Sequence, residues 1–394
     1  MPKLHTTTSS PNYFGTHSVT PLTTESEASH SKPDELQPET AIVYCEGNFG
    51  EIDGKTANGL ARHSEKYKIL SIIDSAKEGQ DAGKLLDGEP SGIHIYRDLG
   101  TALAHAGRAP KHLIFGIAPA SGMLSPAERR LLLRAIGYGI NIVNGLHEFL
   151  NDDPEFREAC AKSGAIIRDV RKPRAKKNLR VFSGRISEVT CPRIAVLGTD
   201  CAIGKRTTAT VLTAALKARG INAIMIGTGQ TGLIQGARYG LALDAVPSQF
   251  CAGELEATIL EAFENENPDV ILIEGQGSLS HPAYSTSSFI LRGSCPQGVV
   301  LQHAPERKHR CDFEGMPMPT PASEIKLIEA FAKTKVIGLT LNHENMTDAE
   351  VSQAITKYEK QLGIPCTDVL TRSAERLVNK LLSTFPQIGA AVSN

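Results

Sequence analysis

The chain has no tryptophan, few aromatic residues and almost no net charge. Of its 394 residues, 5% are aromatic, and 42 lysines and arginines nearly balance 43 aspartates and glutamates. This balance lacks the basic bias of nucleic-acid-binding proteins, so we expect no nucleic-acid partner. Small and aliphatic side chains dominate instead, which is typical of helices packed closely on a parallel sheet.

Long apolar runs and paired cysteines are also missing. No stretch approaches the length of a membrane span, so we expect no membrane partner. The eight cysteines are scattered singly without a CxxC pair. That pattern argues against a disulfide scaffold or a zinc knuckle, and it fits a reducing cytosol. The sequence therefore predicts a cytoplasmic protein and indicates no metal site.

The chain divides into four regions. Residues 1–38 are rich in Ser, Thr, Pro, Glu and His without hydrophobic periodicity, and we expect a disordered tail. Its acidic residues argue against a mitochondrial transit peptide. Residues 39–170 should form a Rossmann-like domain and residues 193–394 a P-loop α/β domain. The basic segment within 171–192 is interpreted as a solvated linker between them.

Apolar runs and helical periodicity alternate along both domains. Expected strands are 41–45, 68–73, 93–96, 112–117, 140–143, 165–167, 193–197, 223–227, 270–273, 298–302, 336–341 and 367–370. Expected helices are 55–67, 99–106, 125–138, 153–163, 209–219, 253–266, 322–332, 348–362 and 373–383. This order predicts an α/β fold with a doubly wound N-terminal sheet and a P-loop NTPase-like parallel sheet in the C-terminal domain.

The stretch around which the second domain is organised reads GTDCAIGKRTT. It follows an apolar strand and precedes a helix, and this combination forms a phosphate cradle from backbone amides, the helix N-terminus and a lysine. We predict that the whole stretch binds the phosphates of a cofactor: Gly198, Thr199, Asp200, Cys201, Ala202, Ile203, Gly204, Lys205, Arg206, Thr207 and Thr208.

This loop departs from the Walker A pattern in two places. Five residues, not four, separate Gly198 from Gly204, and Arg206 stands between Lys205 and Thr207. The longer loop resembles dethiobiotin synthetase, which has a G-T-D-x-x-x-G-K-T loop, but the arginine is a departure even from that. It displaces the hydroxyl that normally coordinates Mg²⁺, although Thr207 or Thr208 could still reach the ion. The loop is thus well suited to holding a phosphate and less suited to metal-assisted phosphoryl transfer.

A carboxylate ends the apolar run 270–273 and is followed by the residues GQG. In P-loop proteins a carboxylate here faces the phosphates, often through Mg²⁺. We predict catalytic roles for Glu274 and His281, and substrate contacts for Gln276 and Tyr284. A solvated strand-end acid and a surface histidine are the simpler alternatives.

Two further segments should lie at the same edge, because parallel strands gather ligands at their carboxyl ends. The segment 227–233 is expected to be a flexible, glycine-rich loop, and we predict that Thr228, Gln230 and Thr231 bind substrate. Asn342 ends a late strand and is predicted to contact the adenine of the cofactor. Both ATP and coenzyme A carry an adenine, so Asn342 does not discriminate between them.

Polar groups near strand ends of the first domain could bind a small carboxylate-bearing substrate. We predict this role for Lys55, Arg62 and His147. Individually, each of these side chains fits a structural role equally well.

Several of these segments together resemble one family. They are 198–208, 227–232, 273–279, 281–284 and 142–147. The family was described only as a domain of unknown function, and it includes D-glutamate N-acetyltransferase. The resemblance, which spans about residue 41 to the C-terminus, implies a Rossmann-like domain followed by a P-loop domain. It further implies acetyl-CoA as donor, a D-amino acid as acceptor, coenzyme A phosphates on the loop, and a homodimer.

We therefore expect an amino-acid N-acetyltransferase acting on D-glutamate or a related D-amino acid, with Glu274 or His281 as general base. The alternative is a synthetase or kinase similar to dethiobiotin synthetase, with ATP and Mg²⁺ as cofactors and the metal held by Glu274 and Thr207. A third possibility is a non-catalytic nucleotide-binding protein.

Overall fold

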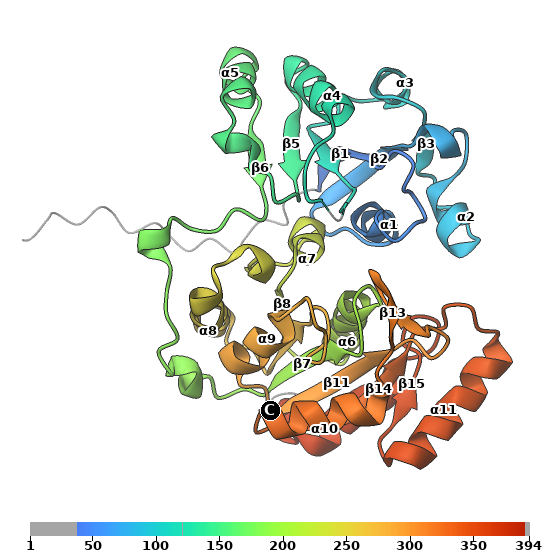
Figure 1. The fold of residues 1–394 in the computed structure, drawn as a ribbon, viewed down its shortest axis with the longest axis vertical. Helices are drawn as coiled ribbons and strands as arrows, with labels where there is room; N and C mark the ends of the chain where they lie inside the picture. The colour runs from blue at the N-terminus through green and yellow to red at the C-terminus, as the bar shows by residue number, and fades with distance from the viewer. Residues whose placement is uncertain (1–37, 120, 391–394) are drawn as a thin grey trace, which may run out of the picture. The chain divides into compact units, whose positions relative to one another are not determined.

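Two parallel sheets organise the chain, one in each half (Figure 1). The computed structural model describes residues 38–119 and 121–390, which belong to one compact unit. The expected disordered tail, 1–38, lies outside the described residues except for Pro38. No described helix has the length and apolar character needed to cross a membrane.

The first sheet has six strands in the order β3-β2-β1-β4-β5-β6, all parallel. Its strands are β1 Glu39–Tyr44, β2 Tyr67–Ile73, β3 His94–Tyr96, β4 His112–Phe115, β5 Asn141–Asn144 and β6 Ile167–Asp169. Its helices are α1 Lys55–Arg62, α2 Ala82–Asp87, α3 Leu99–His105, α4 Pro126–Gly137 and α5 Pro154–Ser163. The winding reverses between β1 and β4, which confirms the Rossmann-like, doubly wound prediction.

The second sheet has seven strands in the order β15-β14-β11-β7-β10-β8-β9. They are β7 Arg193–Gly198, β8 Ala223–Gly227, β9 Tyr239–Gly240, β10 Val270–Glu274, β11 Gly298–His303, β14 Lys335–Leu341 and β15 Cys366–Thr367. A separate antiparallel hairpin joins β12 His309–Arg310 to β13 Phe313–Pro317. The helices are α6 Lys205–Ala218, α7 Gln230–Gln235, α8 Ser248–Glu266, α9 Thr286–Ser294, α10 Pro321–Phe331, α11 Asp348–Leu362, α12 Glu375–Thr384 and α13 Gln387–Ala390.

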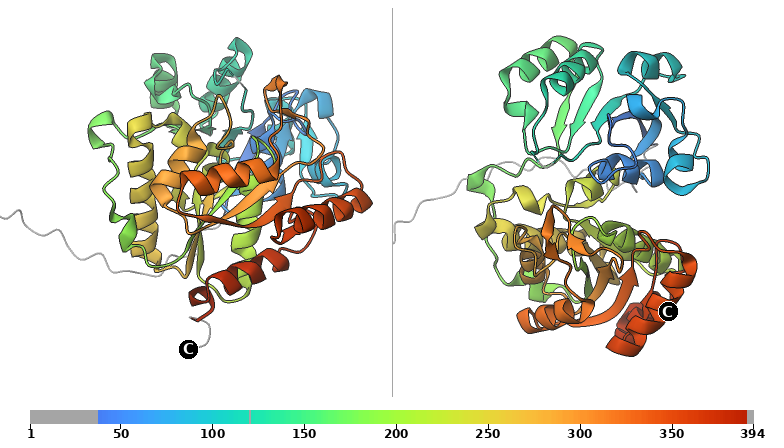
Figure 2. Two further views of the ribbon diagram at one scale, coloured as in Figure 1. Left: turned by 60° about the horizontal axis from the view of Figure 1, so that its bottom comes forward. Right: turned by 45° about the vertical axis from the view of Figure 1, so that its right-hand side comes forward.

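Strand β7 lies at the centre of this sheet, between β10 and β11, and all six of its residues are buried. Its side chains alternate between two cores. Ala195 and Leu197 pack in the core that includes residues of α8, α10 and α11, whereas Ile194 and Val196 pack in the core that includes residues of α6 and α12. Helices cover both faces of this sheet in the ribbon views (Figures 1 and 2). Burial on both faces explains why this strand reads as a continuous apolar run, and it fixes the start of the phosphate loop.

The basic segment between the domains is exposed along most of its length, as expected for a solvated linker, but the protein holds the residues that follow it. Two buried carboxylates of α8 hold these residues: Glu254 accepts bonds from the backbone and guanidinium of Arg180, and Glu256 accepts from the backbone amides of Ser183 and Ile186. Charge alone suggested solvation. The two glutamates lie about 70 positions downstream of the residues they bind, so these contacts could not be predicted from the local sequence.

The expected flexible loop 227–233 is also different in the structure. Helix α7 begins at Gln230, so only the first residues of that segment form a loop. Helix α6 begins at Lys205, four residues before the expected start, and α8 begins at Ser248, five residues before it. Helix α2, helix α9 and the hairpin β12–β13 were not predicted. Helix α2 is short, the hairpin is mostly exposed, and α9 (TSSFILRGS) has few apolar residues, so none of them carries clear hydrophobic periodicity.

Candidate functional site

The phosphate loop connects β7 to α6 through two left-handed residues. Ala202 has φ of +49° and Gly204 has φ of +102°. The value at Gly204 favours glycine, because other residues would be strained there. The turn delivers the chain directly into α6 at Lys205, so the free amides of the helix N-terminus meet the loop amides. This arrangement is an anion cradle.

The ammonium group of Lys205 is folded back onto this loop. It donates a hydrogen bond to the backbone oxygen of Asp200, and the side chain is buried. Burial lowers the pKa of Lys205, while the nearby Cys201 and Asp200 oppose that shift. Lys205 thus lies where it could bind a phosphate, but its ammonium group is hydrogen-bonded to the backbone oxygen of Asp200.

Two of the loop hydroxyls are engaged by the protein. Thr208 donates a 2.5 Å hydrogen bond to Oε1 of Gln302, and Thr199 Oγ1 lies 2.9 Å from Nδ1 of His303. Both threonines are fully buried. Thr207 is half-buried and follows Arg206, the residue that occupies the usual hydroxyl position.

Glu274 and Arg206 are charged residues near the loop, and the charge of each shifts the pKa of the other. Glu274 is 5% exposed, and its Oε2 accepts a 2.9 Å bond from the amide of Thr228. Burial raises the pKa of the Glu274 carboxyl, and the charge of Arg206 opposes this rise. A buried carboxyl with a raised pKa at the end of a strand is a candidate for proton transfer.

Most predicted substrate residues near Glu274 are hydrogen-bonded to protein groups. Gln276 donates to the backbone oxygen of Thr228, whose hydroxyl donates to the backbone oxygen of Glu274. The hydroxyl of Thr231 pairs with that of Thr56 at 3.0 Å, and the neighbouring Gln230 is buried. The sequence thus placed these residues at the correct edge, where they tie β8, β10 and α1 together.

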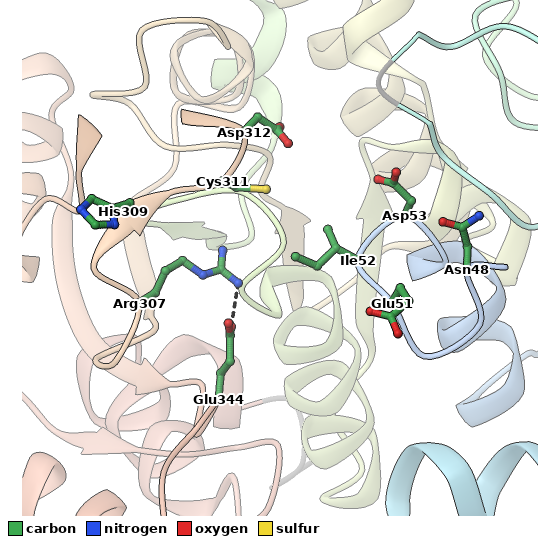
Figure 3. A pocket seen from close by; sticks show the side chains of 9 residues that line it. All are labelled: Asn48, Glu51, Ile52, Asp53, Arg307, His309, Cys311, Asp312 and Glu344. Carbon is green, nitrogen blue, oxygen red and sulfur yellow. Dashed lines mark hydrogen bonds and ion pairs between the residues drawn. The ribbon is translucent and has the colours of Figure 1, made fainter. Parts of the chain in front are cut away.

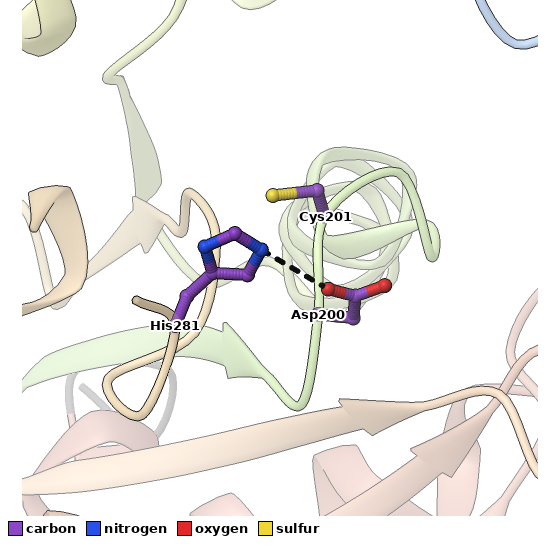
Figure 4. A group of neighbouring side chains, drawn as sticks. All are labelled: Asp200, Cys201 and His281. Carbon is purple, nitrogen blue, oxygen red and sulfur yellow. Dashed lines mark ion pairs between the residues drawn. The ribbon is translucent and has the colours of Figure 1, made fainter. Parts of the chain in front are cut away.

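His281 faces the phosphate loop (Figure 4). Its Nε2 lies 3.7 Å from Oδ1 of Asp200, and both side chains are fully buried. The ring stacks on Tyr284 with centroids 4.6 Å apart, and its Nδ1 accepts a 3.2 Å bond from the amide of Ala283. Burial lowers the pKa of His281, which favours the neutral ring. Because Nδ1 accepts a bond, the ring proton lies on Nε2 in this arrangement.

Arg307 is a site residue that sequence reasoning missed. Its guanidinium donates to Oδ2 of Asp200 at 3.2 Å, to the Cys201 carbonyl at 2.8 Å and to Glu344 at 2.6 Å. The amide of Cys311 also donates to Asp200 Oδ2, at 2.7 Å. A basic residue a few positions after a buried strand was the available signal, because that place lies at the ligand-binding edge of the sheet.

A cavity of about 470 Å³ opens beside Arg307 (Figure 3). Its lining carries four carboxylates and residues of the loop after β1: Asn48, Glu51, Ile52, Asp53, Arg307, His309, Cys311, Asp312 and Glu344. This volume suits a small ligand. None of the residues predicted from the sequence lines it.

The remaining predicted residues lie in different places. Asn342 donates to the carbonyl of Ile203 at 3.2 Å, so it does lie against the phosphate loop. Lys55 is exposed at the start of α1. Burial raises the pKa of Cys201, and the positive charge of Lys55 acts in the opposite direction. Arg62 forms a 2.7 Å ion pair with Asp87 on an exposed surface, and its charge contributes to lowering the pKa of Arg206.

His147 belongs to a cluster with Arg171 and Asp244. Arg171 is buried, and it donates to Nε2 of His147 at 2.6 Å, to the carboxylate of Asp244 and to the carbonyl of Gly145. This cluster connects the end of the first domain to the second, and the His147 side chain within it stays 49% exposed.

Comparison with known proteins matches both halves of the chain. The model described as "Domain of unknown function (DUF1611_C) P-loop domain" matches residues 180–378, and "Domain of unknown function (DUF1611_N) Rossmann-like domain" matches residues 75–173. A crystal structure of a DUF1611 family protein from Anabaena variabilis is 32% identical, with a TM-score of 0.81 over 88% of this chain and 99% of that chain.

Two curated relatives carry an enzyme name. A "D-glutamate N-acetyltransferase" from Tritonibacter scottomollicae is 31% identical over 279 residues, which are 69% of this chain and 81% of that protein. A protein of the same name from Pseudoalteromonas sp is 31% identical over 278 residues, with the same coverage. These findings confirm the family resemblance and the fold class expected from the sequence.

Proposed function

The chain belongs to the DUF1611 family, and from this membership we propose that it is an N-acetyltransferase. The donor is acetyl-CoA, and the acceptor is the amino group of a small amino acid, D-glutamate or a related D-amino acid. The phosphate loop holds the coenzyme A phosphates. The names of the two relatives support the reaction class.

One observation carries the proposal beyond those names. The loop keeps every part of an anion cradle, but Arg206 replaces the hydroxyl that would hold Mg²⁺, and the hydroxyls of Thr199 and Thr208 are bonded to His303 and Gln302. A loop of this kind suits a diphosphate that is bound and left intact. The diphosphate of coenzyme A remains uncleaved during acetyl transfer.

The proposed reaction needs a base and an oxyanion-stabilising group. We assign the base to Glu274, since burial raises the pKa of its carboxyl and it lies beside the loop. His281 is the weaker candidate, because its Nδ1 accepts a bond from Ala283 and its Nε2 is turned to Asp200. The amine attacks the thioester carbonyl and gives a proton to Glu274. When the tetrahedral intermediate collapses to the amide, the C–S bond breaks and the thiolate takes that proton from Glu274, so coenzyme A leaves as the free thiol.

An ATP- and Mg²⁺-dependent synthetase or kinase is the second candidate. The position of Glu274 at the end of β10 favours it, because a carboxylate there commonly reaches the metal in P-loop enzymes. In that reading Glu274 and Thr207 would hold Mg²⁺, and Lys205 would meet the transferring phosphoryl group.

Calorimetry with the full chain separates the two candidates. Coenzyme A should bind without Mg²⁺, and Mg-ATP should bind more weakly. Tight ATP binding that needs Mg²⁺, with no affinity for coenzyme A, would overturn the acetyltransferase proposal. Release of free coenzyme A thiol from acetyl-CoA should then be measured with D- and L-amino acids, D-glutamate included. No release with any of them would also count against the proposal.

A further inference from the structure

We propose that Asp200, Cys201 and His281 form a binding site for one divalent transition-metal ion of the zinc type. The ligand atoms are Oδ1 of Asp200, Sγ of Cys201 and Nε2 of His281, which all lie within 4.8 Å of one another. Figure 4 shows the carboxylate and the imidazole facing each other, with the sulfur on the same side. This site does not depend on the proposed acetyl transfer.

The first support is a pair of buried polar atoms that the protein leaves unsatisfied. Oδ1 of Asp200 and Nε2 of His281 have no hydrogen-bond partner among the described residues, and both side chains are fully buried. They are 3.7 Å apart, which is too far for a hydrogen bond between them. Buried polar atoms are usually paired, so two unpaired atoms aimed at one space indicate that something else binds there.

The distance between the oxygen and the nitrogen is close to that expected at a metal ion. A tetrahedral zinc with bonds of about 2.0 Å to nitrogen or oxygen and about 2.3 Å to sulfur holds its ligand atoms roughly 3.3–3.6 Å apart. The observed 3.7 Å between oxygen and nitrogen is close to this spacing. Three protein ligands leave a fourth position for water or a ligand atom, as in zinc sites that take part in chemistry.

Neighbouring residues hold the Asp200 carboxylate and the His281 ring in position. Oδ2 of Asp200 is held by the amide of Cys311 and by Arg307, and the His281 ring lies between Tyr284 and Phe313. Such outer contacts orient metal ligands and keep them from rotating away. Coordination needs the His281 proton on Nδ1, so the Ala283 amide gives up its 3.2 Å bond, a small loss beside three metal–ligand bonds.

Charge and ligand type select the ion. The cations Lys205, Arg307 and Arg310 lie around the cluster and oppose a metal. An ionised Asp200 and a Cys201 thiolate together carry two negative charges, which balance a divalent ion. The thiol transfers its proton to water when the metal binds. A thiolate and an imidazole favour zinc-like ions over Mg²⁺, which prefers oxygen ligands.

Cobalt provides a direct test on the full chain. Protein stripped with a chelator is titrated with Co²⁺, and we expect a thiolate-to-cobalt charge-transfer absorption that saturates at one equivalent and disappears when Zn²⁺ is added. Cys201→Ser should abolish the absorption. His281→Gln should weaken binding by about tenfold or more. Circular dichroism of each variant establishes that it is folded.

Two matched controls make the test specific. Cys311→Ser keeps the backbone amide that holds Asp200 but changes a neighbouring thiol, and Cys295→Ser removes an exposed thiol. Both should retain the full cobalt absorption. Folded wild-type protein without the absorption would overturn the proposal. So would an absorption that survives Cys201→Ser, because another cysteine would then be the ligand.

Discussion

The hydroxyl of Thr208 donates a 2.5 Å hydrogen bond to Oε1 of Gln302, which fastens the first turn of α6 to the neighbouring strand β11. Both residues are fully buried. The hydroxyl of Thr208 therefore has a structural role, whereas the hydroxyl of Thr207 makes no such hydrogen bond in the described part of the chain.

Thr208→Val should destabilise the fold. The substitution leaves the buried Oε1 of Gln302 without its hydrogen-bond donor. We expect the free energy of unfolding to fall by about 1–3 kcal/mol. Urea denaturation measures it, with Thr207→Val as the matched control that should change stability little. Equal losses in both variants would show that the Thr208 bond has no special weight.

Lys205→Ala should weaken donor binding while the fold survives. A charged hydrogen bond to a phosphate contributes about 1.5–3 kcal/mol, so we expect coenzyme A affinity to fall by about 10- to 150-fold in calorimetry. Lys217→Ala removes an exposed lysine of the same helix and serves as control. Unchanged affinity in Lys205→Ala would place the donor elsewhere.

Glu274→Gln should slow acetyl transfer by roughly 10²- to 10⁴-fold if the carboxylate is the base. Burial raises the pKa of Glu274, so the acidic limb of the wild-type rate profile should lie above the usual glutamate range, and activity should fall as pH drops through it. Glu261→Gln, at an exposed position of α8, is the control. A variant of Glu274 that retains full activity would exclude it as the base.

His303 should make the protein sensitive to acid. Burial lowers the pKa of His303 to about 4, because the ring lies between Thr199 and Tyr358 away from water. The folded state thus favours the neutral ring. Its stabilising contribution is present above the ordinary histidine pKa of about 6.5 and is lost as pH falls toward 4.

The expected loss is about 3 kcal/mol between pH 7 and pH 4. Urea denaturation at several pH values measures it. His303→Gln should have a flatter pH dependence than the wild type, whatever its absolute stability, whereas the exposed His309→Gln should keep the wild-type slope. Identical slopes in all three proteins would contradict the assignment.

Arg171→Met should weaken the connection between the domains. It removes the donor to Asp244, His147 and the carbonyl of Gly145. We expect a loss of about 1–3 kcal/mol, less than for a fully buried pair because the Asp244 side chain stays 28% exposed. Denaturation followed by two probes, one in each domain, checks whether the two unfolding curves separate. Lys172→Met, which removes the more exposed neighbouring cation, is the control and should leave the curves coincident.

The phosphate loop could be predicted because its parts are contiguous in the sequence. Strand, loop and helix N-terminus occupy neighbouring positions, and Glu274 follows an apolar run that identifies its place in the sheet. Arg307 and Cys311 could not be placed in the same way. They contact Asp200 from 107 and 111 positions downstream. Arg307 precedes an exposed hairpin without hydrophobic periodicity, and Cys311 lies in its turn.

The fold class followed from the alternation of strands and helices, whereas contacts between the halves did not. Local sequence shows that Arg171 is basic but not that Asp244 lies opposite it, so a buried residue was expected to be solvated. The same limit applies to Arg62, whose partner Asp87 lies on a six-residue helix too short to be predicted.

The folded-back position of Lys205 has a consequence for selectivity. Since the ammonium already rests on the Asp200 carbonyl, an arriving anion must replace that carbonyl, and binding is an exchange of partners. The gain from the exchange grows with the charge of the newcomer. The loop should therefore bind a diphosphate more tightly than singly charged anions such as chloride or acetate.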